Sequence, residues 1–362
     1  METKLTRRIV AALQPFVDRG VLAGAATLVA DRERVLSRAC VGFANIAARE
    51  PMRPGTMFWI ASQTKAMTAA ALMMLVEEGK VAIEDPVEKY LPEFKDQWMT
   101  VEQDGQHMLL KKPAHPITVR NILTHTSGMP FATGVELPKR DMLPLANAVR
   151  SYAAMPLQWE PDTKYSYANT GFNTAGRMIE VLSGMSYEEF MNARLFQPLG
   201  MKDTTFWPTR KQITRLARVY APDAQKTGLV ESNIEPLTYP LDSCKRFPMP
   251  GGGLFSTATD AGRFCQMMLN RGVLDGRRYL SESMVAAMSR KQTPAALSDS
   301  YGLGFFIGDG VYGHGGAYAT NMTIDTRRGL VLVFHVQHAG FPGDGSNSQA
   351  AFQAAVTREW RG

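Results

Sequence analysis

The sequence predicts an α+β protein in which an antiparallel sheet is made from both ends of the chain and flanked by helices. A mainly helical lobe is inserted between the two sheet-forming segments. Residues 24–30 and 35–43 are two strand-like runs separated by the polar turn 31–34, which predicts an antiparallel hairpin. Strand-like runs return towards the other end of the chain, whereas the middle favours helices separated by proline- and glycine-rich loops.

The remaining elements follow in chain order. Residues 6–19 predict an amphipathic helix, and the run after Ser62 predicts a buried helix of about four turns that ends near Gly79. Residues 325–329 fit a hairpin turn. Further helices are expected at 119–124, 145–155, 171–183, 186–196, 259–271, 280–290 and 348–360, and further strands at 303–307, 319–324 and 331–336. We place a sheet domain at 1–80 and 250–362, a mainly helical domain at 81–249, and the active site between them.

Composition excludes several classes of protein. The 362 residues are 45% hydrophobic and 20% charged, as in ordinary globular proteins, and no apolar run reaches membrane-spanning length. The net charge of +6 comes from scattered basic residues without aromatic interleaving, so we expect no nucleic-acid partner. As written, the chain is expected to be cytoplasmic, or periplasmic or secreted if an export signal was trimmed. The sequence leaves the oligomeric state open.

Ser62 and Lys65 are the first candidate site residues. Three positions apart at a helix start, they project from the same face, and the free N–H groups there can receive a negative oxygen. Such pairs also arise by chance on solvated faces. Here the flanks 58–60 and 67–75 are strongly apolar, and an unpaired lysine is rarely tolerated in a core helix. A serine hydroxyl, a neighbouring amine and backbone N–H groups without an intrahelical partner are together the parts of an acyl-transfer site.

Two later segments are weaker candidates. Tyr165-Ser166-Tyr167-Ala168-Asn169 lies on a loop, where a tyrosine held near a lysine is expected to have a lowered pKa and to act as a base. A packed aromatic corner is the alternative. His314-Gly315-Gly316-Ala317 leads into a predicted strand, and its glycines allow an edge strand to approach a ligand closely. A plain glycine turn is the alternative.

Together these segments resemble a known family. Ser62-Gln63-Thr64-Lys65, Tyr167-Ala168-Asn169 and His314-Gly315-Gly316 are similar to the three motifs of the serine β-lactamase and penicillin-binding protein superfamily. The resemblance is closer to its class C branch, which includes D-alanyl-D-alanine and D-amino-acid peptidases and β-lactamase-like carboxylesterases. The stretches 122–129, 198–201 and 250–257 also resemble that branch, so the motifs extend over nearly the whole chain.

The resemblance implies a β-lactamase/transpeptidase-like fold and a role for each motif residue. Ser62 would be the nucleophile, Lys65 its proton partner and Tyr167 the general base and acid, while Asn169 would orient the substrate and the lysine. The backbone N–H groups of Ser62 and Ala317 would form the oxyanion hole, beside the substrate-binding residues His314, Gly315 and Gly316. No cofactor is implied.

One departure from the family pattern affects the expected substrate. Most β-lactamases have a lysine where this chain has His314, and a histidine is only partly charged near neutral pH. It would hold a β-lactam carboxylate less firmly. We therefore expect a serine hydrolase that acts through an acyl-enzyme on small esters or amides, with or without weak β-lactamase activity.

Other functions remain open at this point. A β-lactamase or a D-alanyl-D-alanine or D-amino-acid peptidase would use the same residues, and so would a penicillin-binding module that acylates without turnover. A Ser-His-Asp hydrolase is disfavoured because no histidine has a supporting motif. His335 and His338 have no third ligand at metal spacing, so we expect no metal site.

Overall fold

The predicted sheet is present and is built from both chain ends. The computed structural model describes residues 3–358, and its main sheet has seven strands in the order β12-β13-β14-β15-β1-β2-β3. Every neighbouring pair in it is antiparallel. Its strands are β1 (Gly24–Ala30), β2 (Val35–Asn45), β3 (Glu50–Pro51), β12 (Phe306–Ile307), β13 (Val311–Gly315), β14 (Asn321–Asp325) and β15 (Leu330–His335).

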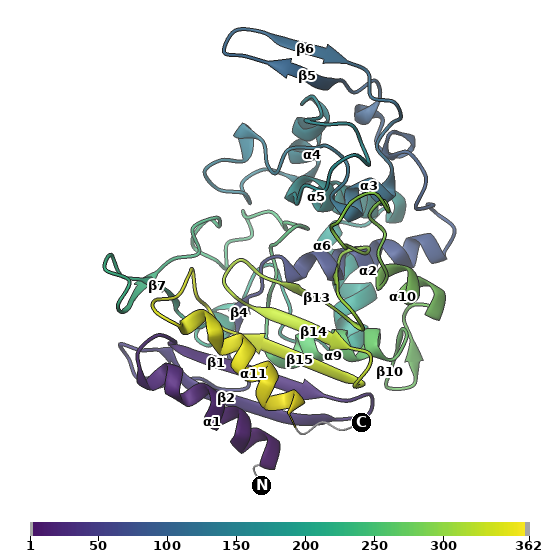
Figure 1. Ribbon diagram of the computed structural model, residues 1–362. Coiled ribbons are helices and arrows are strands. Elements are labelled where there is room, and N and C mark those ends of the chain that lie inside the picture. Colours follow the sequence, from purple (N-terminus) through teal and green to yellow (C-terminus); the bar gives the residue numbers. More distant parts are fainter. Residues whose placement is uncertain (1–2, 359–362) are drawn as a thin grey trace.

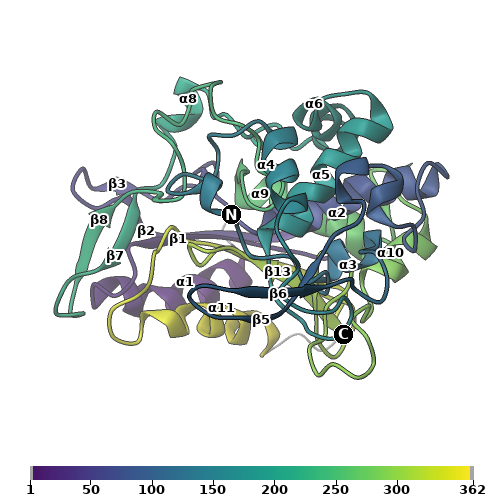
Figure 2. The ribbon, with the colours of Figure 1, turned by 90° about the horizontal axis from the view of Figure 1, so that it is seen from above.

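Both faces of the sheet are covered, which explains why its central strands are apolar on both sides. In β1, Leu28 belongs to the larger core and Val29 to a second core under the terminal helices. Figure 1 shows α1 (Lys4–Asp18) and α11 (Ser348–Thr357) lying together on one face. Seen from above, α9 (Ala258–Leu269) lies on the opposite side of the sheet (Figure 2).

The helix α2 (Gln63–Glu77) is buried on all sides because nearly every residue in it is apolar or small. It contacts α5 (Asn169–Ser183), α6 (Tyr187–Met191), α10 (Glu282–Met288) and β13 of the sheet. The chain leaves it through Gly79, whose φ of +71° suits glycine. The helix therefore links the sheet to the helices above it, and its first turn lies beside the strand that carries His314.

Two short strands hold the start of α2 against the glycine-rich stretch 250–254. β4 (Phe58–Trp59) pairs antiparallel with β9 (Phe255–Ser256). The Ile60 N–H also donates to the Leu254 carbonyl at 2.9 Å. Residues nearly 200 positions apart in sequence are thereby fixed next to Ser62.

Residues 81–249 contain helices but also two hairpins, β5–β6 and β7–β8, that the sequence did not predict. The β5–β6 hairpin extends away from the rest of the molecule at the top of Figure 1. Its residues are mostly exposed on both faces, so no alternation of apolar and polar residues marks it.

The division into domains at residues 80 and 250 stays a prediction. The elements of this segment are α3 (Val119–Thr124), α4 (Leu145–Ala153), α5, α6, α7 (Gln197–Leu199), α8 (Arg210–Ile213), β5 (Met99–Gln103), β6 (Met108–Lys111), β7 (Val219–Pro222) and β8 (Leu229–Ser232), with short 3₁₀ helices at Val87–Lys89, Pro92–Phe94 and Gly134–Glu136 and a π-helical turn at Asn192–Phe196.

Several predicted boundaries differ from the structure. The predicted strand 303–307 is confined to β12, and β13 was missed because its glycines conceal the strand pattern. His314 lies within β13, which has a neighbouring strand on each side, but the short β12 pairs only with Tyr312 and Gly313. At His314 and Gly315 the strand is therefore paired only with β14, as expected of an edge. The predicted end of the last helix, up to Trp360, lies outside the described residues. The other small elements are β10 (Val273–Leu274), β11 (Arg277–Arg278) and a 3₁₀ helix at Gly345–Asn347.

None of the helices in the described part of the chain combines the length and hydrophobicity needed to cross a bilayer.

Candidate active site

A cavity of about 350 Å³ opens at the start of α2, beside the end of β13. Seven of the eight site residues predicted from the sequence line it, and the eighth, Lys65, contacts Ser62 through its Nζ atom. The lining residues are Trp59, Ala61, Ser62, Phe131, Arg140, Tyr167, Asn169, Pro236, Met249, Gly251, Gly252, Phe306, His314, Gly315, Gly316 and Ala317.

Ser62 is held on a tight turn immediately before α2. Ala61 has a φ of +45°, a left-handed conformation that costs a non-glycine residue roughly 1–2 kcal/mol. The Thr64 hydroxyl donates to the Ala61 carbonyl at 2.6 Å, and the Gln63 N–H donates to the Ile60 carbonyl at 3.1 Å. These bonds hold the strained turn, which presents the Ser62 side chain to the cavity.

Lys65 is fully buried, and its Nζ atom has three oxygen partners. Nζ donates to Asn169 Oδ1 at 2.7 Å and to the Gly251 carbonyl at 2.6 Å. It also lies 3.2 Å from Ser62 Oγ and 4.7 Å from the centroid of the Tyr167 ring. The side chains at 62, 65, 167 and 169 therefore converge at one place, although they come from two segments about 100 residues apart.

The electrostatic environment favours the neutral form of Lys65. Burial lowers the pKa of its amine well below the ordinary value of 10.5, and the positive charge of Arg140 lowers it further. Within the described part of the chain, no carboxylate is among its hydrogen-bond partners. The lowered pKa increases the neutral fraction of the amine, and a neutral amine can accept a proton.

Tyr167 behaves differently from our expectation. Burial raises the pKa of its phenol to about 12, and a hydrogen bond with Ser62 offsets this only in part. The expected lowering of this pKa is therefore wrong, because the cost of burying a phenolate outweighs any benefit from the nearby lysine. At neutral pH the phenol keeps its proton and can donate it.

His125 is a residue whose position in the site the sequence did not reveal. It takes a left-handed conformation at the end of α3, with φ of +62°, and so caps this helix. Its ring lies 4.4 Å from the ring centroid of Tyr167 and 4.7 Å from that of Tyr301, and its Nδ1 accepts the Ala168 N–H at 3.1 Å. His125 thus packs against the Tyr167 segment and binds its backbone, a role that has no local sequence signal.

His314 is buried, and both of its ring nitrogens are engaged. Nδ1 lies 2.6 Å from the Gly315 carbonyl, which can only accept, so we assign the proton to Nδ1. Nε2 then accepts the Tyr301 hydroxyl at 3.0 Å. Burial, and secondarily the charge of Lys65, lowers the pKa of His314 to about 3. The expectation of a partly charged His314 is therefore wrong, since the imidazole is neutral at neutral pH.

Two backbone donors lie at the cavity wall. Across the described residues, the N–H groups of Ser62 and Ala317 have no hydrogen-bond acceptor within the protein. Both residues line the cavity. They are the donors that the resemblance assigns to an oxyanion hole, and that role stays a prediction.

Gly316 is the glycine of this segment that packing requires. A Cβ placed on it would lie 2.5 Å from the Ile60 carbonyl oxygen and 2.2 Å from Thr320 Oγ1. A Cβ on Gly315 would have no neighbour closer than 3.6 Å. Gly316 thus lets β13 approach the backbone just before Ser62.

We expect Gly316→Ala to lower the free energy of unfolding by about 1–3 kcal/mol, because either the strand or the turn before Ser62 must move. Gly315→Ala, the matched control, should change it by less than about 0.5 kcal/mol. Urea unfolding monitored by circular dichroism measures both. Equal stability of the two variants would contradict this account of Gly316.

Gly251 also contributes to the site through its backbone. Its carbonyl accepts the Lys65 amine, and its N–H donates to Asn173 Oδ1 at 2.9 Å. A Cβ on it would lie 3.1 Å from the Asn169 side chain, which is tighter than ordinary contact. No pattern in the sequence indicated this bond to the lysine.

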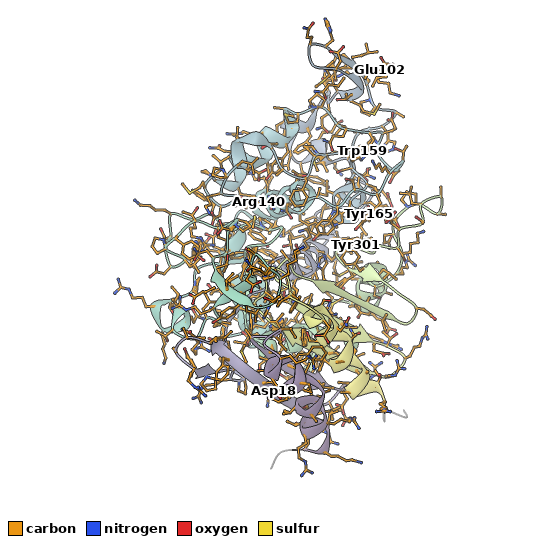
Figure 3. The ribbon with its side chains drawn as sticks, turned by 60° about the vertical axis from the view of Figure 1, so that its left-hand side comes forward. Asp18, Glu102, Arg140, Trp159, Tyr165 and Tyr301 are labelled. Carbon is orange, nitrogen blue, oxygen red and sulfur yellow. The ribbon has the colours of Figure 1, made fainter. Side chains whose placement is uncertain are left out.

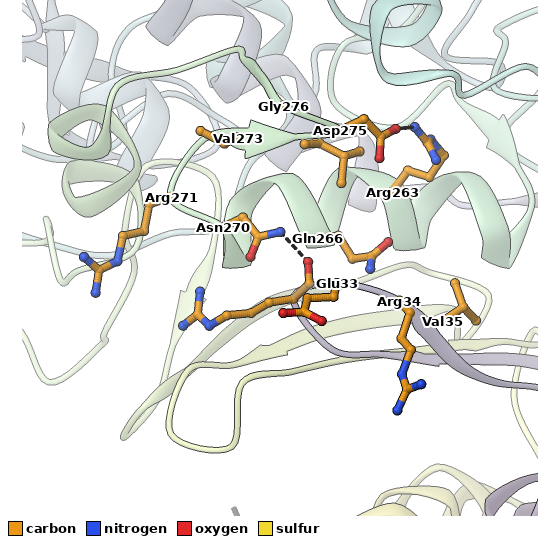
Figure 4. A pocket seen from close by; sticks show the side chains of 12 residues that line it. Glu33, Arg34, Val35, Arg263, Gln266, Asn270, Arg271, Val273, Asp275 and Gly276 are labelled. Atoms are coloured by element: carbon orange, nitrogen blue, oxygen red, sulfur yellow. Dashed lines mark hydrogen bonds and ion pairs between the residues drawn. The ribbon is translucent and has the colours of Figure 1, made fainter.

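A second, larger cavity of about 560 Å³ lies between the β1–β2 turn and α9 (Figure 4). Its polar groups mainly join these elements: Asn270 donates to the Arg32 carbonyl at 2.7 Å, and Arg263 pairs with Asp275. It contains no group that resembles a nucleophile with an adjacent base.

His335 and His338, the two histidines considered as metal ligands, make hydrogen-bond contacts inside the fold. His335 lies 3.3 Å from the Gln63 side chain, and His338 accepts the Ala23 N–H at 3.1 Å. Within residues 3–358, no three His, Cys, Asp or Glu side chains are grouped as metal ligands.

Comparison with known proteins identifies the family. The Beta-lactamase family model matches residues 9–356. The chain is 31% identical over 274 residues to penicillin-binding protein 4 of Amycolatopsis lactamdurans, covering 72% of this chain and 66% of that protein. It is 27% identical over 368 residues to esterase EstB of Burkholderia gladioli, covering 89% and 88%. The solved structure of unliganded simvastatin synthase (LovD) from Aspergillus terreus shares the fold, with a TM-score of 0.83 at 19% identity over 99% of this chain and 100% of that one. The chain therefore belongs to the Beta-lactamase family.

Proposed function

We propose that the protein is a serine hydrolase that cleaves small esters or amides through an acyl-enzyme on Ser62. The observation that carries the proposal is the 3.2 Å contact between Lys65 Nζ and Ser62 Oγ at the wall of a cavity. A serine hydroxyl is a weak nucleophile until a neighbouring base takes its proton. Esterases and penicillin-binding proteins among the relatives are consistent with such chemistry.

The hydrogen bonds of Lys65 favour its role as the base. Its two shorter bonds go to Asn169 Oδ1 and the Gly251 carbonyl, which can only accept protons. A neutral amine has two N–H groups for these acceptors and one lone pair left over. That lone pair can accept the proton of the remaining partner, the Ser62 hydroxyl.

The proposed reaction has two halves. Ser62 Oγ attacks the substrate carbonyl while its proton moves to Lys65, and the N–H groups of Ser62 and Ala317 bind the negative oxygen that forms. Tyr167, which stays protonated, donates to the leaving alcohol or amine as the carbonyl–oxygen or carbonyl–nitrogen bond breaks. It regains a proton from Lys65. Water then attacks the acyl-enzyme by the same route and releases the acid. Each oxyanion donor contributes roughly 3 kcal/mol to such a reaction.

The neutral His314 favours esters over β-lactams as substrates. Because both of its nitrogens are engaged, β13 presents no cation to a carboxylate at this position. Apolar side chains, among them Phe131, Met249 and Phe306, form much of the cavity wall and suit an acyl chain.

One parallel assay tests this proposal. We expect faster turnover of 4-nitrophenyl butyrate than of a chromogenic cephalosporin, because the cephalosporin carboxylate lacks a cation on β13. Intact-mass measurement during both reactions detects an acyl adduct. Faster cephalosporin turnover would show that the protein is a β-lactamase. A stable adduct with a labelled penicillin and no turnover of either substrate would show a non-turnover penicillin-binding module. An absence of both turnover and adduct would refute the proposed function.

A further inference from the structure

Arg140 is a cation that lines the active-site cavity. Among the described residues, its guanidinium makes no hydrogen bond or ion pair, and it lies over the Phe131 ring with Cζ 4.8 Å from the centroid. Figure 3 places Arg140 at about the level of Tyr165 and above Tyr301, two tyrosines of the aromatic cluster around His125. It is also close enough to Lys65 to lower the pKa of that amine.

The loop that carries Arg140 is firmly anchored. The next residue, Asp141, forms a fully buried ion pair with Arg246 at 2.7 Å and accepts the Thr238 hydroxyl at 2.7 Å. The Arg140 N–H donates to the Pro236 carbonyl at 3.0 Å. Because removing one member of a buried pair is strongly unfavourable, this anchoring fixes the backbone from which the Arg140 side chain extends.

The other titratable groups near the cavity already have hydrogen-bond partners within the protein. Lys65 has three oxygen partners, and His314 is neutral with both nitrogens engaged. Glu136 is the acid whose pKa responds to Arg140, but it is buried and accepts from Tyr152 and the Thr133 N–H. Arg140 is therefore left available to a negative group on a bound molecule.

We propose that Arg140 binds a carboxylate on the substrate, so that the enzyme prefers esters or amides that carry one away from the scissile bond. This inference rests on the proposed hydrolase function. An arginine fork matches a carboxylate bidentately, and the apolar wall of the cavity reduces competition from water. The cation is supplied by the 131–142 loop and not by β13, so a carboxylate bound there would lie away from the strand.

Matched substrate pairs test the proposal on both sides of the scissile bond. On the acyl side, mono-4-nitrophenyl glutarate differs from 4-nitrophenyl pentanoate by a carboxylate in place of the terminal methyl group. On the leaving-group side, 3-acetoxybenzoate differs in the same way from 3-methylphenyl acetate. For each pair the ratio of kcat/KM, anionic over neutral, is measured in wild type and variants. Any effect of Arg140 on Lys65 changes kcat/KM for both substrates of a pair by the same factor, so it cancels in the ratio.

In Arg140→Gln we expect the ratio to fall by roughly 10-fold in at least one pair, mainly through KM. Arg140→Lys should recover part of the loss, since it keeps the charge but not the fork. Lys139→Gln is the control, because it removes the same charge one residue away, where Nζ is bound to the Glu235 carbonyl. In wild type, added salt should lower the ratio.

A ratio that changes by less than about twofold in both pairs would overturn the role of Arg140. An equal fall in Lys139→Gln would do so as well, because it would show a general effect of net charge. Failure of the proposed function gives a different result: hydrolysis of all four esters would then survive Ser62→Ala.

Discussion

Replacing Ser62 by alanine is expected to slow hydrolysis of 4-nitrophenyl butyrate by about 10⁴-fold or more. The variant keeps the cavity and the backbone donors but lacks the oxygen that would form the acyl-enzyme. Losses of this size are found when a nucleophile is removed from a group of residues that act as a unit. Initial rates, corrected for spontaneous hydrolysis, measure the effect, and intact mass should no longer detect an acyl adduct.

A matched serine variant separates this effect from general damage. Ser283 lies on α10, outside the cavity, so Ser283→Ala should keep wild-type activity. The Ser62 variant should also keep its fold, because among the described residues its hydroxyl makes two hydrogen-bond contacts, with Lys65 at 3.2 Å and with Tyr167. Activity above a tenth of the wild-type rate in the folded Ser62 variant would exclude the proposed mechanism.

Replacing Lys65 by methionine should be the second largest loss, about 10³-fold, and should exceed that of Tyr167→Phe, at roughly 10²-fold. The amine is proposed as the base, whereas the phenol, with a pKa raised to about 12, is proposed only to relay a proton. In wild type, kcat/KM should fall as the pH drops through the pKa of Lys65, because protonation removes the lone pair that accepts the serine proton. In the methionine variant, this fall of kcat/KM at low pH, the acid limb of the pH profile, should be absent.

Lys80→Met provides the control for loss of a lysine. Lys80 follows the end of α2 and pairs with Glu78 at the surface, so its removal should leave the pH profile unchanged. Thermal unfolding of Lys65→Met must be followed as well, since Asn169 Oδ1 and the Gly251 carbonyl lose a donor there. A folded Lys65 variant that retains the wild-type acid limb would assign that limb to another group.

Local patterns in the sequence were enough for most of the central elements. The run from Gln63 to Glu77 predicts a buried helix because helix formers without a polar stripe must be covered on all sides, and the structure has this helix. Strand β1 and helix α3 begin and end where the sequence placed them. The turn 325–329 joins β14 and β15 as predicted. These elements succeed because their signals, periodicity and turn residues, lie within a few positions of each other.

The sequence by itself determined the family and the order of the motifs, because each motif is a short run of residues that can be recognised without its neighbours in space. Only the tertiary structure decided the charge states and contacts of the site. The neutral His314, the raised pKa of Tyr167 and the position of Arg140 over the Phe131 ring depend on which side chains, brought from distant segments, exclude water from one another. Desolvation and partner geometry are properties of the folded surroundings, so residue type and spacing could not supply them.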